Sequence, residues 1–105
     1  MEGEQSFEKG NRSECKSKMS ELAFDFFQEH LVENIEFVFA DVMISFNRGS
    51  EKRQGSVLML RSINFPEHQV GFTIEFSKEY IDGEFLNDLN VCYSNFQRGL
   101  KEKFN

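Results

Sequence analysis

The chain has 105 residues, which suits a single domain with one modest hydrophobic core. Its 18 acidic residues outnumber 12 Lys and Arg, so the formal net charge is −6, and this argues against nucleic-acid binding by bulk charge. The uninterrupted apolar runs are far shorter than the roughly 20 residues of a membrane span, and two cysteines are too few for a disulfide framework.

The first 18 residues are predicted to form a flexible leader, separate from a single α+β domain over residues 19–105. They mix acidic, basic and small polar residues and lack the apolar stretch of a secretory signal. We therefore expect a cytoplasmic protein. Cys15 and Cys92 could pair by number alone, but no cysteine motif supports a disulfide, and we expect both to stay reduced.

Residues 20–33 have the spacing of an amphipathic helix. Apolar side chains recur every three or four positions from Leu22 to Leu31, and acidic residues lie around the other side. The hydroxyl of Ser20 can cap the start of this helix, and Asn34 is suited to its end.

Residues 35–46 are dense in β-branched and aromatic side chains, which predicts a long strand. Val38 and the alternate residues after it would share one face, and Phe37 and Phe39 would lie on the other, away from the main core side. A second interpretation stays open, because some of these apolar residues also fit a helical period that would extend the preceding helix.

Two further strands, at residues 56–63 and 69–77, complete a predicted three-stranded antiparallel meander. Residues 47–55 are polar and basic and predict a loop longer than a tight hairpin turn, followed by a strand at 56–63. Pro66 marks a turn at 64–68, in which His68 should face solvent. Strict alternation over 69–77 then predicts a strand with one buried and one solvated face.

After a turn at 78–83, apolar residues spaced by three and four predict a terminal helix of about 20 residues. Asp82 is its candidate N-cap, and Gly99 should weaken it by about 1 kcal/mol relative to Ala. The predicted fold class is α+β: a helix, a three-stranded antiparallel meander and a C-terminal helix, packed in two layers.

No pattern in the chain predicts catalysis, a metal or a cofactor. His30 and His68 lack ligand spacing with Cys or carboxylates, and Cys92 falls on the apolar stripe of the last helix. The glycines form no phosphate-binding loop. Since no nucleophile, base and orienting residue are placed together, we expect that the protein is not an enzyme.

The charge pattern favours a protein-binding module, an inhibitor, immunity-type or chaperone-like partner of a basic protein. Carboxylates complementary to a cationic surface speed association and select the partner, and aromatic side chains can anchor it. The residues predicted to bind the partner are Asp25, Glu29, Glu33, Glu36, Phe37, Phe39, Asp41, Glu79, Asp82, Glu84 and Asp88.

Two other interpretations remain open. A homo-oligomeric structural or regulatory unit, such as a homodimer, could pair through an exposed strand edge, because residues 35–39 are apolar on both faces. A local nucleic-acid contact would need Arg48, Lys52, Arg53 and Arg61 to act against the acidic balance of the whole chain.

Overall fold

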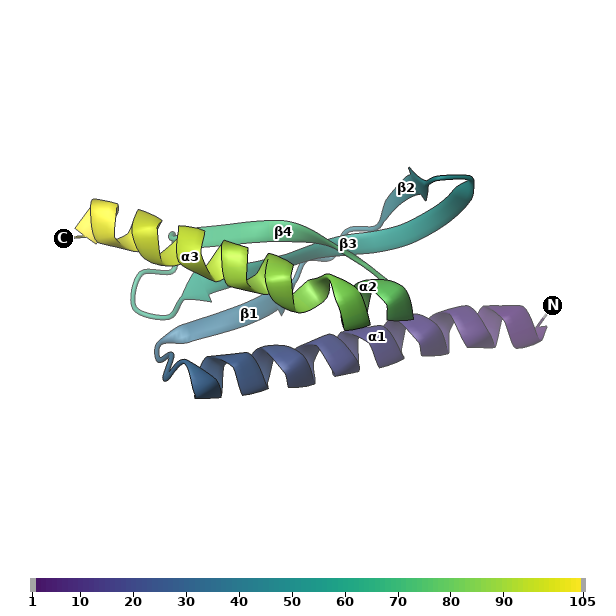
Figure 1. The fold of residues 1–105 in the computed structure, drawn as a ribbon, viewed down its shortest axis with the longest axis horizontal. Coiled ribbons are helices and arrows are strands. Elements are labelled where there is room, and N and C mark those ends of the chain that lie inside the picture. Colours follow the sequence, from purple (N-terminus) through teal and green to yellow (C-terminus); the bar gives the residue numbers. More distant parts are fainter. Residues whose placement is uncertain (1, 105) are drawn as a thin grey trace.

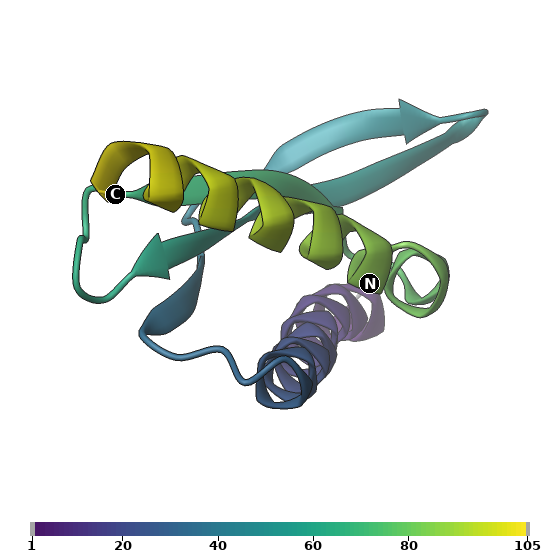
Figure 2. The same ribbon diagram turned by 60° about the vertical axis from the view of Figure 1, so that its left-hand side comes forward.

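A computed structural model describes residues 2–104, with side chains described for residues 12–103. The elements in chain order are α1 (Glu2–Glu29), β1 (Ile35–Phe39), β2 (Ile44–Arg48), β3 (Glu51–Ser62), β4 (Gln69–Glu75), α2 (Lys78–Gly83) and α3 (Phe85–Phe104). The strands form one antiparallel sheet, and α1 and α3 lie on the same face of it (Figures 1 and 2). The predicted α+β class is confirmed.

The long strand β3 organises the sheet. β4 pairs with one edge of it, and β1 and β2 follow one another along the other edge. Between the last β1 pair, Phe39 with Leu58, and the first β2 pair, Ile44 with Gly55, residues 40–43 face only residues 56 and 57. The predicted strand at 35–46 is thus confirmed with a break, and its helical alternative is wrong.

A side-chain hydroxyl stabilises this break. Ser56 Oγ lies 3.0 Å from the carbonyl oxygen of Ala40 and 2.8 Å from that of Val42, and Ser56 is buried. Two carbonyls that leave the regular ladder therefore share a buried donor in its place.

The loop predicted at 47–55 is wrong, because β2 and β3 continue to Arg48 and Glu51 and only Gly49 and Ser50 form the turn. Gly49 has φ +64°, in the left-handed region that two-residue hairpin turns require and that glycine adopts without steric cost. The hairpin projects from the body of the molecule (Figure 1). Its side chains are therefore mostly polar on both faces and give no alternating pattern.

The predicted start of the first helix at Ser20 is also wrong. α1 begins at Glu2, so the expected leader is helical from residue 2 onward. The proposed boundary at residue 18 therefore falls inside this helix, and Met1 lies outside the described residues. Cys15, Met19 and Ala23, spaced by four, continue the apolar stripe and are buried. The helix ends at Glu29, and Leu31 and Asn34 then take positive φ values of 53° and 64°.

The core lies between the sheet and the two long helices. α3 contributes the apolar stripe predicted from its spacing, with Phe85, Leu89 and Phe96 almost fully buried. Residues 78–83, predicted as a turn, form the short helix α2. Its N-cap is Ser77, whose Oγ accepts the Tyr80 amide at 3.2 Å. The prediction that Asp82 would cap the last helix is wrong, because Asp82 lies inside α2 and α3 begins at Phe85.

Candidate protein-interaction surface

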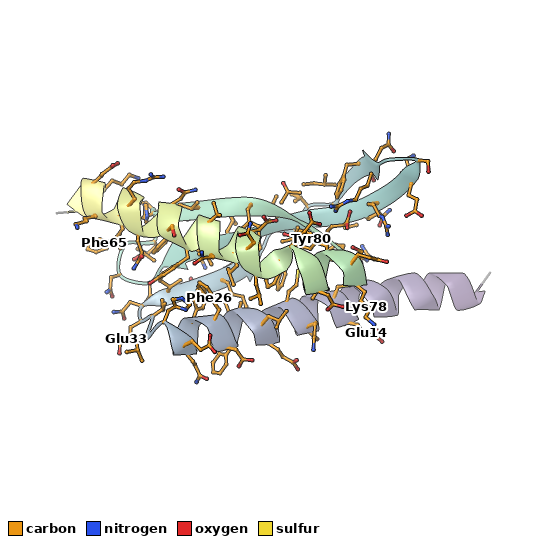
Figure 3. All side chains as sticks on the ribbon, viewed as in Figure 1. Glu14, Phe26, Glu33, Phe65, Lys78 and Tyr80 are labelled. Carbon is orange, nitrogen blue, oxygen red and sulfur yellow. The ribbon has the colours of Figure 1, made fainter. Side chains whose placement is uncertain are left out.

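The last turns of α1 carry exposed acids. Asp25 and Glu29 are four residues apart and therefore share one side of the helix, and Glu33 follows in the connection to β1, where Figure 3 labels it. Glu21, one turn before Asp25, is exposed as well and was not among the predicted site residues. We name Glu21, Asp25, Glu29 and Glu33 the α1 acids.

Among the described side chains, no ion pair neutralises the α1 acids. From residue 19 to residue 47 the sequence contains no Lys or Arg. The ion pairs among the described side chains use Glu36, Glu51, Glu75 and Glu84 and none of the α1 acids. Asp25 and Glu29 also lie near the C-terminal end of a helix, where the helix dipole disfavours negative charge.

An apolar groove of about 360 Å³ lies between α1 and β1, beside these acids. We name it the α1–β1 groove; it is lined by Phe24, Phe27, Gln28, Val32, Ile35, Glu36 and Phe37. Phe24 is 56% exposed, whereas Phe27 is buried with its ring centroid 5.9 Å from that of Phe37. An exposed aromatic ring beside an apolar floor is typical of a site that receives another chain.

The structure corrects the predicted orientation of two site residues. Phe37 and Phe39 were expected to face away from the main core, but both pack against it from β1. Phe37 still reaches the floor of the α1–β1 groove, whereas the ring of Phe39 lies 5.7 Å from Lys16 Nζ. The prediction was wrong because both alternating sets of residues 35–46 are rich in apolar side chains, and periodicity alone cannot tell which set faces the helices.

Glu36 and Asp41 take separate positions. Glu36 lies at the edge of the α1–β1 groove and pairs with Arg61 at 2.6 Å. Asp41 is exposed in the break between β1 and β2. Only Glu36 of these two therefore lies at the groove.

The second predicted acidic set lies elsewhere, around α2. Glu84 pairs with Arg48 at 2.6 Å, and Asp88 accepts a 2.8 Å hydrogen bond from the Tyr80 hydroxyl. Glu79 and Asp82 are exposed, but Asp82 shares a pocket with Lys18 and Lys78. Lys78 lies where α2 passes the middle of α1, away from Glu33 (Figure 3). These acids are partly neutralised and do not extend the surface at the α1 acids.

Sequence reasoning missed a buried polar cluster at the base of the hairpin. In the alternation of residues 69–77, Glu75 belongs with Gly71 and Thr73 to the face expected to be solvated, yet its side chain is only 3% exposed. Arg48 approaches its carboxylate at 3.3 Å, and Ser77 Oγ donates to it at 2.5 Å. The same Ser77 oxygen accepts from the Tyr80 amide, and Tyr80 donates to Asp88. Burial, followed by the Asp88 contact, raises the pKa of Tyr80 well above its ordinary value. The cluster joins the hairpin to α2 and α3.

The histidines and cysteines serve packing. His68 is buried, not solvent-facing as predicted, and its Nε2 donates to the carbonyl of Phe96 at 2.8 Å. His30 stacks on Phe26 at 4.2 Å between ring centroids. Burial raises the pKa of Cys92 to about 11, and burial followed by the charge of Glu14 raises the pKa of Cys15, so neither thiol is activated as a thiolate, and no disulfide joins the two.

The described residues hold neither a metal-binding cluster nor a membrane-spanning helix. No three His, Cys, Asp or Glu side chains gather there as they would around a metal ion. In that part of the chain no helix is long and apolar enough to cross a membrane. Comparison of the chain with protein-family models, with characterised proteins and with solved structures found no match in any of the three.

Proposed function

We propose that the protein is a small non-enzymatic binding module that receives a segment of a basic protein in the α1–β1 groove, as an inhibitor, immunity-type or chaperone-like partner. We place this activity in the cytoplasm. The observation that supports the proposal is the set of unneutralised α1 acids beside an apolar groove. The apolar floor of the groove supplies an anchor site for a partner side chain, and the acidic residues around it attract cations.

The position of Asp25 and Glu29 supports a role in binding over a role in stability. A carboxylate near the C-terminal end of a helix opposes the dipole by roughly 0.3–1 kcal/mol. α1 has no basic residue in its last turn to compensate. A cationic partner would relieve this repulsion, so acids that disfavour the isolated fold would favour the complex.

The double variant D25K/E29K tests the proposal against the matched control E67K/E102K, which alters exposed acids outside this surface by the same charge. Each immobilised protein is exposed to lysate of its native cell, and the recovered proteins are identified and purified. We expect wild type and control to capture the same basic protein, and D25K/E29K to bind it about tenfold more weakly. Binding should also weaken between about 0.05 and 0.3 M salt.

The same double variant should be more stable than wild type. We expect its free energy of unfolding to rise by about 0.6–2 kcal/mol, because two carboxylates that oppose the helix dipole are replaced by lysines that favour it. Urea unfolding followed by circular dichroism measures this change. Equal capture by D25K/E29K and wild type, or recovery of no basic protein, would refute the proposed function.

A homodimer is the second candidate, and it is favoured by the free edge of β1, since among the described strands β1 pairs with β3 alone. Its test is the molar mass in solution. Sedimentation that gives a monomer at high concentration excludes it, and a dimer whose formation is blocked by changes in β1 would support it.

A further inference from the structure

We propose that the partner segment binds as an additional β-strand on the free edge of β1, with apolar residues alternating with Lys or Arg. This inference rests on the proposed function, since it specifies how a basic segment occupies the α1–β1 groove. The geometry of the sheet shows which backbone groups are available for such pairing.

Alternate residues of β1 direct their backbone groups away from the sheet. The Ala40 amide donates to the Val57 carbonyl at 2.8 Å, and the Ile63 amide donates to the Asn34 carbonyl at 2.9 Å. In the antiparallel register these contacts assign the even-numbered residues of β1, Glu36 and Val38, to the ladder with β3. The amides and carbonyls of Ile35, Phe37 and Phe39 therefore point outward along the free edge.

Two of these three residues also contribute their side chains to the α1–β1 groove. Ile35 and Phe37 line it, opposite Phe24 and Phe27 of α1. A strand added to β1 would place one set of its side chains on this side, where apolar groups would cover Phe24. Its other set would lie on the side of Glu36, which is 45% exposed although it pairs with Arg61.

The opposite edge of the sheet is less available. α3 packs along β4, and the Tyr80 hydroxyl approaches the carbonyl of Thr73 at 3.4 Å. The Phe76 amide donates to the Gln54 carbonyl, and the Ser62 amide donates to the His68 carbonyl. In the β3–β4 register, the even-numbered residues of β4 therefore pair with β3, and the backbone groups of the odd-numbered residues, Thr73 among them, point outward. A carbonyl of this edge is therefore already engaged.

Charge selects a basic partner over a second copy of the chain. Pairing β1 with β1 of another molecule would bring two sets of α1 acids toward each other, and residues 19–47 supply no Lys or Arg to offset them. A basic segment meets the opposite situation, because the α1 acids attract it during its approach to the groove. The charge distribution thus favours a foreign cationic strand.

Amide hydrogen exchange with a defined probe tests the inference. The probe is an eight-residue peptide of alternating Val and Lys with blocked ends, added to the full chain at about ten times its dissociation constant. We expect exchange at Ile35, Phe37 and Phe39 to slow about tenfold, and binding to weaken in D25K/E29K. Two control peptides, one with the same residues in blocks and one N-methylated at alternate positions, should not protect these amides.

The outcomes separate the two proposals. If the Val-Lys peptide or the captured basic protein binds wild type better than D25K/E29K but leaves the three amides unprotected, strand addition is wrong and the proposed function stands. Protection of the β4 amides Gly71 and Thr73 also overturns strand addition. The three β1 amides could also become protected without peptide, to an extent that grows with protein concentration, while the molar mass doubles. This result would identify a second copy of the chain as the occupant and overturn binding of a foreign strand. If neither cationic ligand binds and D25K/E29K captures as wild type does, both proposals fail.

Discussion

The contact between Gly99 and His68 gives the most direct test of the packing described above. Gly99 lies within α3, where an alanine would ordinarily favour the helix by about 1 kcal/mol. A Cβ placed on Gly99, however, would lie 2.9 Å from Cε1 of the His68 ring. This ring is buried and held by its hydrogen bond to the Phe96 carbonyl, so it cannot move without breaking that bond.

The expected net effect of Gly99→Ala follows from these opposing contributions. Overpacking a filled core costs about 1–3 kcal/mol, and a displaced ring leaves a buried donor and acceptor unpaired for about 1–3 kcal/mol more. These losses outweigh the gain in helix propensity. We expect the variant to be less stable than wild type by about 1–5 kcal/mol.

Urea unfolding of Gly99→Ala in two backgrounds measures the effect. In His68→Ala the ring is absent, so the same substitution should stabilise the protein by about 1 kcal/mol, and the sign of the change should reverse. Gly83→Ala is the control, because nothing lies within 4 Å of its added Cβ. A stabilising Gly99→Ala in the wild-type background, or equal effects in both, would refute the steric argument.

Two further outcomes follow from the buried polar cluster and the buried thiol. Arg48→Met should lower stability in urea unfolding more than Glu84→Gln does. The first change leaves the 3% exposed Glu75 carboxylate without its cation, whereas the second affects a side chain that is 46% exposed. Equal losses of stability would contradict the role assigned to Glu75. Burial raises the pKa of Cys92 from 9.0 to about 11. The stability that this thiol contributes should therefore be complete below pH 9 and fall as the pH rises toward 11. In Cys92→Ala, the free energy of unfolding should decrease less over this pH range.

The elements that could be predicted from the sequence are those with one face on the core. β4 alternates and α3 repeats every three or four residues because burial on one side sets their periods. Residues 47–55 gave no such signal, since the hairpin extends beyond the core. The early part of α1 was missed because its buried positions are Cys15, Met19 and Ala23, which stand among charged residues and weigh little in a hydrophobic pattern.

The candidate site was predicted in part for a similar reason. Asp25, Glu29 and Glu33 could be chosen from charge and helical spacing, both of which are local. The groove beside them could not, because Phe24 and Phe37 meet only when α1 folds back along β1. The burial of Glu75 likewise depends on Arg48, which is 27 positions away in sequence.

The direction of the two long helices has a practical consequence for capture experiments. The first turns of α1 lie at one end of the long axis of the molecule, and the last turns of α3 lie toward the other end, where α1 leads into the connection that carries Glu33 (Figures 1 and 3). A surface linker or affinity tag joined before α1 would hold the α1–β1 groove outward from a solid support. The same tag joined after α3 would turn the groove toward the support and hinder a large partner, so the position of the tag should decide the yield of capture.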